Sequence, residues 1–320
     1  MVRWTIEERL SRIEARRVLR STLGNLRDCR IKASTKARYE AAIAFFFASL
    51  ASEDESLVSR AEDLDGQLCR HVERLWSEGE RRPLAEDLLS GLKHFCPALK
   101  GKFPEAWQLV GVWQFNEPPC RATPFEAEDV MALAAVAFDL DELEVGVALL
   151  VAFQGLLRTG EVGSMLLGDC VLNAAGTVVT IDLGYTKGGT RRHERESVGI
   201  DDPDVVRLLL LCLERGKPGD RLVRGGTPAL RRVFAKLLVA LGMSNGGYQL
   251  YSLRRGGATS MFRATANLSA VVVRGRWQNQ KTARQYIDSG KQDLAKVALP
   301  SESRRKLARA LAKFHDFVAC

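Results

Sequence analysis

The sequence predicts a mainly α-helical protein that carries one small antiparallel β-sheet. Apolar residues recur at helical spacing through most of the 320 residues. Strand-like segments occur convincingly at one place, where residues 177–183 and 193–200 flank a Gly188-Gly189 turn signal. A proline-rich stretch at 97–122 then divides the chain. We therefore predict a helical N-terminal domain over residues 1–118 and a second domain over 119–320.

The N-terminal half is predicted to consist of helices. Residues 11–24 are rich in helix formers and end in glycine. Residues 34–55 open with serine and threonine, which are good N-cap residues, and repeat apolar side chains at helical spacing. Residues 83–96 begin with Pro83, which suits the first helical turn. The segment 97–122, which contains four prolines, is interpreted as a linker.

The second half begins with a strong helix-start signal. In "TPFE", Thr123 is the expected N-cap, Pro124 the first helical residue and Glu126 the third. A further helix is expected over 141–157, followed by the strand pair.

Capped helices follow the predicted sheet. They are expected at residues 201–216 and 227–242. Further helices are expected to fill residues 253–287, and a last amphipathic helix is expected at about 302–318. The last of them carries Leu307, Leu311, Phe314 and Val318 on one face. This face suits packing within the chain or docking on a neighbouring protomer, and both alternatives stay open.

Composition narrows the function classes. No apolar run reaches the roughly 18 to 20 residues of a membrane span, and the charged N-terminus lacks the apolar segment of a secretory signal. We therefore expect an intracellular protein with no membrane partner. Seven scattered cysteines form no C-x-x-C pair, and neither Cys69 with His71 nor His94 with Cys96 completes a four-ligand spacing. We expect no metal and no cofactor.

The charge of the chain is unevenly distributed. The net charge is +8, and residues 151–290 hold 20 Lys and Arg against 11 Asp and Glu. A basic half indicates a polyanionic partner, of which nucleic acid is the commonest.

Four short motifs follow one another in the second half. They are "LLRTGEVGSMLLGD", a lysine in the predicted hairpin, "YSLRRGGAT" and "GRWQNQKTARQYI". The candidate catalytic residues in them are Arg158, Glu161, Lys187, Tyr251, Arg254, Trp277 and Tyr286. Arg254 follows Tyr251 by three positions, and Trp277 follows Arg254 by 23 positions. Tyr286 comes nine residues after that tryptophan.

This order resembles the catalytic domain of the tyrosine recombinases of the phage-integrase type, over about residues 123–290. That family shows an arginine box with a glutamate, a hairpin lysine, an H-x-x-R box, a histidine or tryptophan box and a terminal tyrosine. Tryptophan at position 277 most resembles the Cre recombinase branch. Residues 26–50 are more loosely similar to the family's helical core-binding domain. The resemblance implies a DNA-clamping core-binding domain over 1–118 and a catalytic domain over 119–320.

The resemblance also implies a role for each candidate. Tyr286 would attack phosphorus and hold the DNA 3′ end as a phosphotyrosine. Arg158 and Arg254 would grip the phosphate, since a guanidinium pairs two phosphate oxygens and stays charged. Lys187 would protonate the departing 5′ oxygen.

Two further residues would support these groups. Glu161 would orient the arginines or the tyrosine motif, and Trp277 would donate its indole N–H to a phosphate oxygen. Taken singly, each candidate has an ordinary explanation as a helix-end cation, a turn lysine or a packing aromatic residue. Their joint order and spacing favour the catalytic interpretation.

Tyr251 departs from the family pattern, which has histidine there. A tyrosine can donate one O–H to a phosphate oxygen but carries no positive charge near neutral pH. It also places a second phenol near the phosphate. We predict that Tyr286 is the nucleophile, because its position after Trp277 fits the family.

DNA affinity is expected to come from phosphate contacts of basic residues. The candidates are Arg191, Arg192, Arg195, Arg255, Arg274, Arg276 and Arg284 near the motifs, and Lys32, Lys36 and Arg38 in the N-terminal domain.

The implied function is that of a DNA-associated, site-specific recombinase acting on double-stranded DNA, with four protomers on two sites. Two alternatives stay open. Tyr251 motivates a DNA-binding protein of the same fold that has lost catalysis. A related phosphotyrosine enzyme, such as a type IB topoisomerase or a hairpin telomere resolvase, would use the same chemistry.

Overall fold

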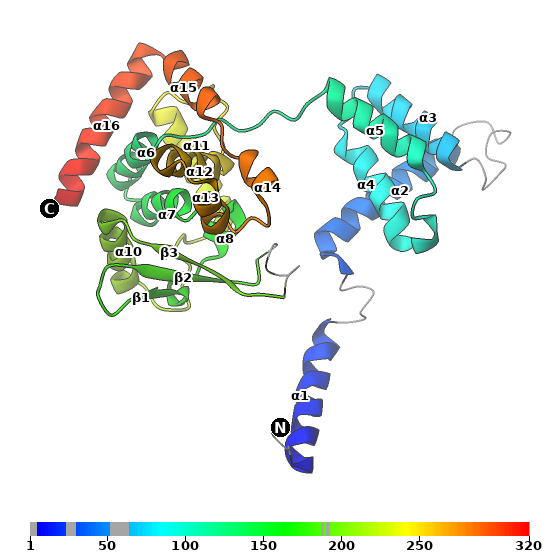
Figure 1. The fold of residues 1–320 in the computed structure, drawn as a ribbon, viewed down its shortest axis with the longest axis horizontal. Helices are drawn as coiled ribbons and strands as arrows, with labels where there is room; N and C mark the ends of the chain where they lie inside the picture. The colour runs from blue at the N-terminus through cyan, green and yellow to red at the C-terminus, as the bar shows by residue number, and fades with distance from the viewer. Residues whose placement is uncertain (1–4, 24–29, 52–63, 187–188, 190–192, 320) are drawn as a thin grey trace. The chain divides into compact units, whose positions relative to one another are not determined.

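A computed structural model describes residues 5–23, 30–51, 64–186, 189 and 193–319. The chain divides into two units, Met1–Cys120 and Arg121–Cys320. Both are mainly helical, and the second also holds a three-stranded antiparallel sheet (Figure 1). The predicted fold class, mainly α with a small antiparallel sheet, is confirmed.

The first unit is built from α-helices. They are α1 (Ile6–Leu23), α2 (Ala33–Ala51), α3 (Leu64–Ser77), α4 (Pro83–Phe95) and α5 (Pro104–Asn116), with a short 3-10 turn, η4, at Pro97–Leu99. Helix α2 packs on α4, and α3 packs on α5. Their facing side chains, among them Phe46, Leu68, Leu88 and Trp113, form one apolar core. Burial of these faces stabilises helices that would be marginal alone.

The prediction of a linker over 97–122 is wrong for most of that segment, because η4 and α5 lie within it. Pro104 occupies the first turn of α5, where its missing N–H is not needed. The next two backbone N–H groups, of Glu105 and Ala106, donate to the carboxylate of Asp65 at 3.1 and 3.0 Å. The cap of α5 therefore comes from α3, about 40 residues earlier in the chain.

The second unit surrounds a larger core. Its helices are α6 (Ala127–Asp139), α7 (Leu143–Gln154), α8 (Thr159–Ser164), α10 (Pro203–Arg215), α11 (Gly226–Ala240), α12 (Tyr251–Thr265), α13 (Leu268–Arg274), α14 (Gln280–Arg284), α15 (Ser289–Ala298) and α16 (Ser301–Ala319), with η5 at Leu167–Asp169. Helix α7 is buried on nearly all sides, and α6, α10 and α12 pack around it. Among the described residues, no helix is long and apolar enough to span a membrane.

The start of α6 differs from the sequence prediction. Glu126 is the N-cap, and its backbone N–H donates to Asp129 at 3.0 Å. Thr123, predicted as the cap, instead donates its hydroxyl to the carbonyl of Gly246 at 2.7 Å. A distant loop therefore engages the hydroxyl that the local pattern assigned to the helix.

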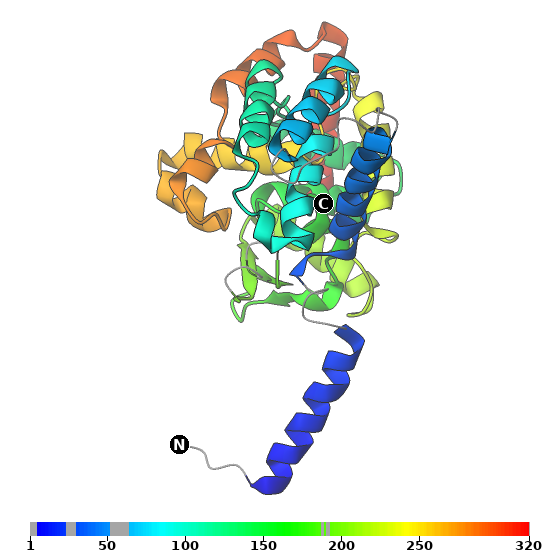
Figure 2. The ribbon, with the colours of Figure 1, turned by 90° about the vertical axis from the view of Figure 1, so that its right-hand side faces the viewer.

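The sheet has the order β1-β2-β3, with β1 at Cys170–Leu172, β2 at Val179–Gly184 and β3 at Glu196–Ile200. Ile181 pairs with Cys170 on one side and Val198 on the other. Val179, Ile181, Val198 and Ile200 bury one face of the sheet, as the period of two requires. In both views the sheet lies at one end of the unit and α15 at the other (Figures 1 and 2).

The last helix packs within its own chain. Phe314 of α16 is 1% exposed, and its ring lies 6.3 Å from that of Phe138 on α6. Val318 and Ala310 are also buried on this face. Of the two alternatives for the apolar face of α16, the structure has packing in cis.

Candidate active site

The first catalytic motif starts a new helix rather than ending the buried one. Helix α7 ends at Gln154, and Leu156 then takes the left-handed conformation with φ of 48°. This sharp reversal brings Arg158 to the N-cap position of α8. The helix expected over residues 141–157 therefore ends three residues early, and Arg158 begins the next helix.

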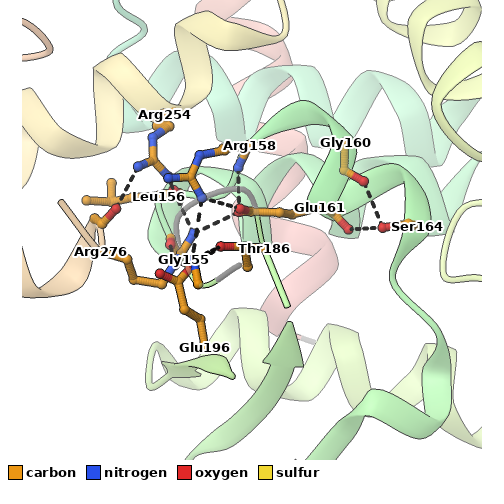
Figure 3. A network of polar contacts seen from close by, with 12 residues as sticks. Gly155, Leu156, Arg158, Gly160, Glu161, Ser164, Thr186, Glu196, Arg254 and Arg276 are labelled. Atoms are coloured by element: carbon orange, nitrogen blue, oxygen red, sulfur yellow. Dashed lines mark hydrogen bonds and ion pairs between the residues drawn. The ribbon is translucent and has the colours of Figure 1, made fainter. Parts of the chain in front are cut away.

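Glu161 holds Arg158 from two directions. Its Oε2 accepts from the backbone N–H of Arg158 at 2.8 Å, and its Oε1 accepts from the guanidinium Nη1 at 2.5 Å (Figure 3). The three-residue spacing on the first turn of α8 makes both contacts possible. The predicted orienting role of Glu161 thus has a geometric basis.

Arg254 is completely buried on α12, with 0% of its surface exposed. Its guanidinium donates to the carbonyls of Leu156 and Gly275, the latter at 2.6 Å. Burial, followed by the positive charges of Arg158 and Arg276, lowers the pKa of Arg254 to about 10. A bound anion would relieve this desolvated charge.

Glycine lets α12 approach the end of α7. A Cβ at position 257 would lie 2.1 Å from the carbonyl oxygen of Phe153, and one at position 256 would lie 2.3 Å from that of Phe125. Only glycine fits such contacts without a shift of the backbone. The "RRGG" sequence therefore places Arg254 directly against the Leu156 turn.

Trp277 and Tyr286 pack beside Arg254. The ring centroids of Trp277 and Tyr286 are 4.5 Å apart, and the Arg254 Cζ lies 4.6 Å from the tryptophan ring centroid and 5.4 Å from the tyrosine's. Two buried donors in this cluster, Arg254 Nε and Trp277 Nε1, have no hydrogen-bond partner among the described residues. Each unsatisfied buried donor needs an acceptor, and a bound anion is one kind of group that could supply it.

The two phenols of the site are in contact. The hydroxyl of Tyr251, the first residue of α12, donates to that of Tyr286, which follows α14. Burial alone would raise the pKa of the Tyr286 phenol. This hydrogen bond, the charge of Arg254, the adjacent indole of Trp277 and the charge of Arg158 together hold the pKa below its usual value. Burial and donation to Tyr286 raise the pKa of Tyr251.

Arg255 ties the tyrosine segment to α12. It is 3% exposed and donates to the carbonyl of Gln285 at 2.9 Å and to Asp288 at 3.0 Å. The backbone N–H of Asp288 donates in turn to the hydroxyl of Thr259 at 3.2 Å. Arg255, expected from the sequence to contact DNA, therefore has its partners inside the unit, on both sides of Tyr286.

Two other predicted DNA contacts also face partners within the chain. Arg276 is buried and paired with Glu161 and Glu196 at 2.8 and 3.4 Å. Arg274 donates to the carbonyl of Gln154 at 3.0 Å and lies 3.5 Å from Asp201.

The remaining basic candidates are partly or fully exposed where they are described. Lys32 and Arg284 are exposed, and Lys36 is half-buried. Arg38 is paired with Asp87 at 2.8 Å, and Arg195 with Asp182. Lys187, Arg191 and Arg192 lie outside the described residues.

Sequence reasoning missed Thr186 and Glu196. Both are 6% exposed, and the Thr186 hydroxyl donates to Glu196 across the β2–β3 hairpin (Figure 3). Nη1 of Arg158 lies 3.9 Å from Glu196. A carboxylate at an inward position of a strand was a usable signal, because a buried charge normally has a partner.

Comparison with known proteins gives matches in structure. No protein-family model and no curated protein matches the sequence. A lambda integrase dimer bound to a core site matches with a TM-score of 0.58 at 18% identity, over 90% of this chain and 96% of that one. The Tn1549 transposon integrase in complex with transposon right-end DNA matches with a TM-score of 0.58 at 14% identity, over 88% of this chain and 95% of that one.

Two further structures extend the likeness. The XerH site-specific recombinase bound to its difH substrate matches with a TM-score of 0.52 at 13% identity, over 83% of this chain and 78% of that one. A lambda integrase tetramer bound to a Holliday junction matches with a TM-score of 0.55 at 17% identity, over 81% of this chain and 72% of that one. The resemblance to the Cre branch stays a prediction. At these identities the likeness concerns the fold, and the chain has the fold of the tyrosine recombinases.

Proposed function

We propose that this chain is a site-specific DNA recombinase of the tyrosine recombinase family, which cleaves and rejoins strands through a covalent 3′-phosphotyrosine intermediate. One observation carries the proposal. Tyr286 lies against the buried guanidinium of Arg254, in a cluster where Arg254 Nε and Trp277 Nε1 have no hydrogen-bond partner among the described residues. A DNA phosphodiester would supply acceptors for both donors and a negative charge for the arginines.

The proposed reaction is an in-line displacement at phosphorus. The Tyr286 oxygen bonds to phosphorus while the bond from phosphorus to the DNA 5′ oxygen breaks, and the phenol proton leaves to solvent. The 5′ oxygen takes up a proton, which we assign to Lys187 as general acid. Attack by the 5′ hydroxyl of another strand then reverses each step and releases Tyr286.

The surrounding residues supply charge and position rather than bonds. Arg158 and Arg254 would neutralise the charge that develops on the non-bridging oxygens. Glu161 holds Arg158, and Trp277 would donate to one of the same oxygens. Tyr251 would stabilise the phenolate of Tyr286 by its hydrogen bond.

DNA binding and assembly follow from the same proposal. The N-terminal unit would act as the core-binding domain and clamp duplex DNA together with the catalytic unit, the protein being DNA-associated in the cell. Exposed Lys32 and Arg284 are proposed phosphate contacts. Four protomers on two DNA sites are proposed by analogy with the lambda integrase tetramer on a Holliday junction.

Covalent capture tests the proposal. The protein is incubated with nicked duplexes from a genomic fragment pool enriched by binding to a Tyr286→Phe variant, and the products are denatured and separated. We expect a protein–DNA adduct that Tyr286→Phe abolishes and Tyr251→Phe retains. Tyr39→Phe, which removes a phenol in the N-terminal unit, is the matched control and should form the adduct normally.

Other results select the alternatives. An adduct lost in Tyr251→Phe and kept in Tyr286→Phe would make Tyr251 the nucleophile. Retained DNA binding with no adduct on the enriched fragments would indicate a DNA-binding protein without catalysis. An adduct accompanied by relaxation of supercoils, with no strand exchange between sites, would indicate the topoisomerase class.

A further inference from the structure

Arg276 has an unusual backbone and a buried side chain. Its φ is 56°, in the left-handed region that residues other than glycine rarely adopt, and its side chain is 7% exposed. Left-handed residues other than glycine persist where the surrounding contacts over-determine them, and they cluster at functional sites. The contacts of the guanidinium identify what holds Arg276 in this conformation.

The guanidinium of Arg276 joins three segments of the chain. Its Nη1 donates to the carbonyl of Gly155 at 3.1 Å, and its Nη2 donates to Oε2 of Glu161 at 2.8 Å. Its Nε lies 3.4 Å from Oε2 of Glu196 on β3. Figure 3 shows these groups converging below Arg254 and Arg158.

Both carboxylates bound by Arg276 have a second task in the site. Glu161 also holds the backbone and the guanidinium of Arg158. Glu196 accepts from Thr186, the residue that precedes the predicted general acid Lys187 in the sequence. Arg276 therefore acts on the phosphate-binding arginine and on the base of the hairpin at once.

The charges of the cluster give Arg276 an electrostatic role as well. Among the described residues of the cluster, Arg158, Arg254 and Arg276 bring three positive charges against the two carboxylates of Glu161 and Glu196, an excess of one positive charge. Without Arg276 the two carboxylates would balance the other two arginines. Arg158 would then be drawn toward the carboxylates and away from the phosphate.

We propose that Arg276 is a positioning residue of the cleavage site, which orients Arg158 through Glu161 and the β2–β3 hairpin through Glu196. This inference rests on the proposed recombinase function. It replaces the sequence-based prediction that Arg276 contacts DNA. The left-handed backbone is then the conformation that aims the guanidinium at both carboxylates.

Kinetics of adduct formation provide the first test. Arg276→Gly removes the guanidinium and places at this position a residue that adopts the left-handed backbone conformation without strain. We expect its adduct formation at saturating DNA to be about a hundredfold slower, with the salt dependence of DNA binding unchanged and the DNA dissociation constant raised no more than about tenfold. Added guanidinium ion at millimolar concentration should restore part of the rate, whereas urea should not. Arg309→Gln, which removes an exposed arginine of α16, is the control.

The failures of the two proposals are distinguishable. A wild-type protein that forms adduct while Arg276→Gly matches its rate would overturn the role of Arg276 alone. Weaker DNA binding with a reduced salt dependence and an unchanged rate would show that Arg276 contacts DNA after all.

A second measurement needs no DNA cleavage. Inorganic phosphate is titrated into the ¹⁵N-labelled protein, and the indole N–H signal of Trp277, assigned with Trp277→Phe, is followed by NMR. We expect the wild-type signal to shift and the apparent affinity to fall about tenfold in Arg276→Gly, since one of three positive charges is lost. An unmoved wild-type signal, or equal affinities in the two proteins, would overturn the inference.

Discussion

The hydroxyl of Tyr251 donates a hydrogen bond to the hydroxyl of Tyr286. The donor stands at the position where the tyrosine recombinases, which this chain resembles, have histidine. The acceptor is the predicted nucleophile. Because the donor stabilises a developing phenolate, Tyr251 lowers the pKa of its neighbour without carrying a charge itself. The departure from the family pattern is therefore compatible with catalysis.

Tyr251→Phe is expected to shift the pH dependence of cleavage to higher pH. Loss of the hydrogen bond removes one of the effects that lower the pKa of Tyr286, so a smaller fraction is ionised at neutral pH. Adduct formation at neutral pH should therefore be clearly slower than in the wild-type protein, and it should recover as the pH rises. The measurement is the rate of adduct formation on a nicked substrate from pH 6 to 10.

Tyr251→His provides the comparison for that profile. Histidine restores a hydrogen-bond donor and should keep the neutral-pH rate above that of Tyr251→Phe. A Tyr251→Phe profile superimposable on the wild-type profile would show that the contact between the two phenols has no catalytic effect.

Arg255 and Arg284 should behave oppositely when mutated. Arg255 holds Gln285 and Asp288 beside the nucleophile, so Arg255→Gln should slow adduct formation about ten- to a hundredfold with little change in the salt dependence of DNA binding. Arg284 is exposed, so Arg284→Gln should lower the slope of log affinity against log salt by about one and leave the rate at saturation intact. DNA-binding titrations at several salt concentrations, with single-turnover rates, separate the two effects. A reduced slope in Arg255→Gln would mean that Arg255 reaches DNA.

The local patterns of the sequence were sufficient for the fold class and for several helices. The capped helix predicted over residues 201–216 is α10, where Asp202 accepts from the N–H groups of Asp204 and Val205 and Pro203 occupies the first turn. The signals are local in such cases, because a cap lies next to the helix that it stabilises. The spacing of the motifs likewise anticipated that Arg254, Trp277 and Tyr286 meet, through the family resemblance.

The features that the sequence did not reveal depend on contacts between distant segments. Helix α5 was interpreted as linker because its segment is rich in proline, and the group that caps it, Asp65, belongs to another helix and gives no local signal. Arg276 was assigned to the surface because basic residues are usually exposed, and the two carboxylates that bury it lie 115 and 80 residues away in the chain. Neither relation leaves a local pattern.

Packing of α16 within the chain predicts a large effect of Phe314→Ala. Phe314 is 1% exposed against α6, so truncation should lower the free energy of unfolding by about 3 to 5 kcal/mol. Phe317 is 43% exposed on the same helix, and Phe317→Ala is the control, with a clearly smaller loss. Urea denaturation of the dilute protein measures both. A loss for Phe314→Ala that appears only at high protein concentration would indicate docking between protomers instead.

His71 predicts that the N-terminal unit loses stability in mild acid. The ring is 4% exposed, stands edge-on to Phe46 and has its Nδ1 3.1 Å from Nη2 of Arg74. Burial, with a smaller contribution from Arg74, lowers the pKa of His71 from 6.5 to about 4.

The unfolded chain binds a proton on His71 more readily than the folded chain does. The free energy of unfolding is therefore highest above pH 6.5, falls as the pH drops, and levels off near pH 4. The total loss is about 2 to 3 kcal/mol. Urea denaturation at a series of pH values, followed by tryptophan fluorescence, measures the loss, because Trp76, Trp107 and Trp113 lie in helices of this unit. His71→Leu should flatten the curve between pH 6.5 and 4, because the titrating group is gone. His315→Gln, on the exposed side of α16, should leave the curve unchanged. A wild-type curve that is already flat in this window would mean that His71 stays accessible to protons in the folded unit.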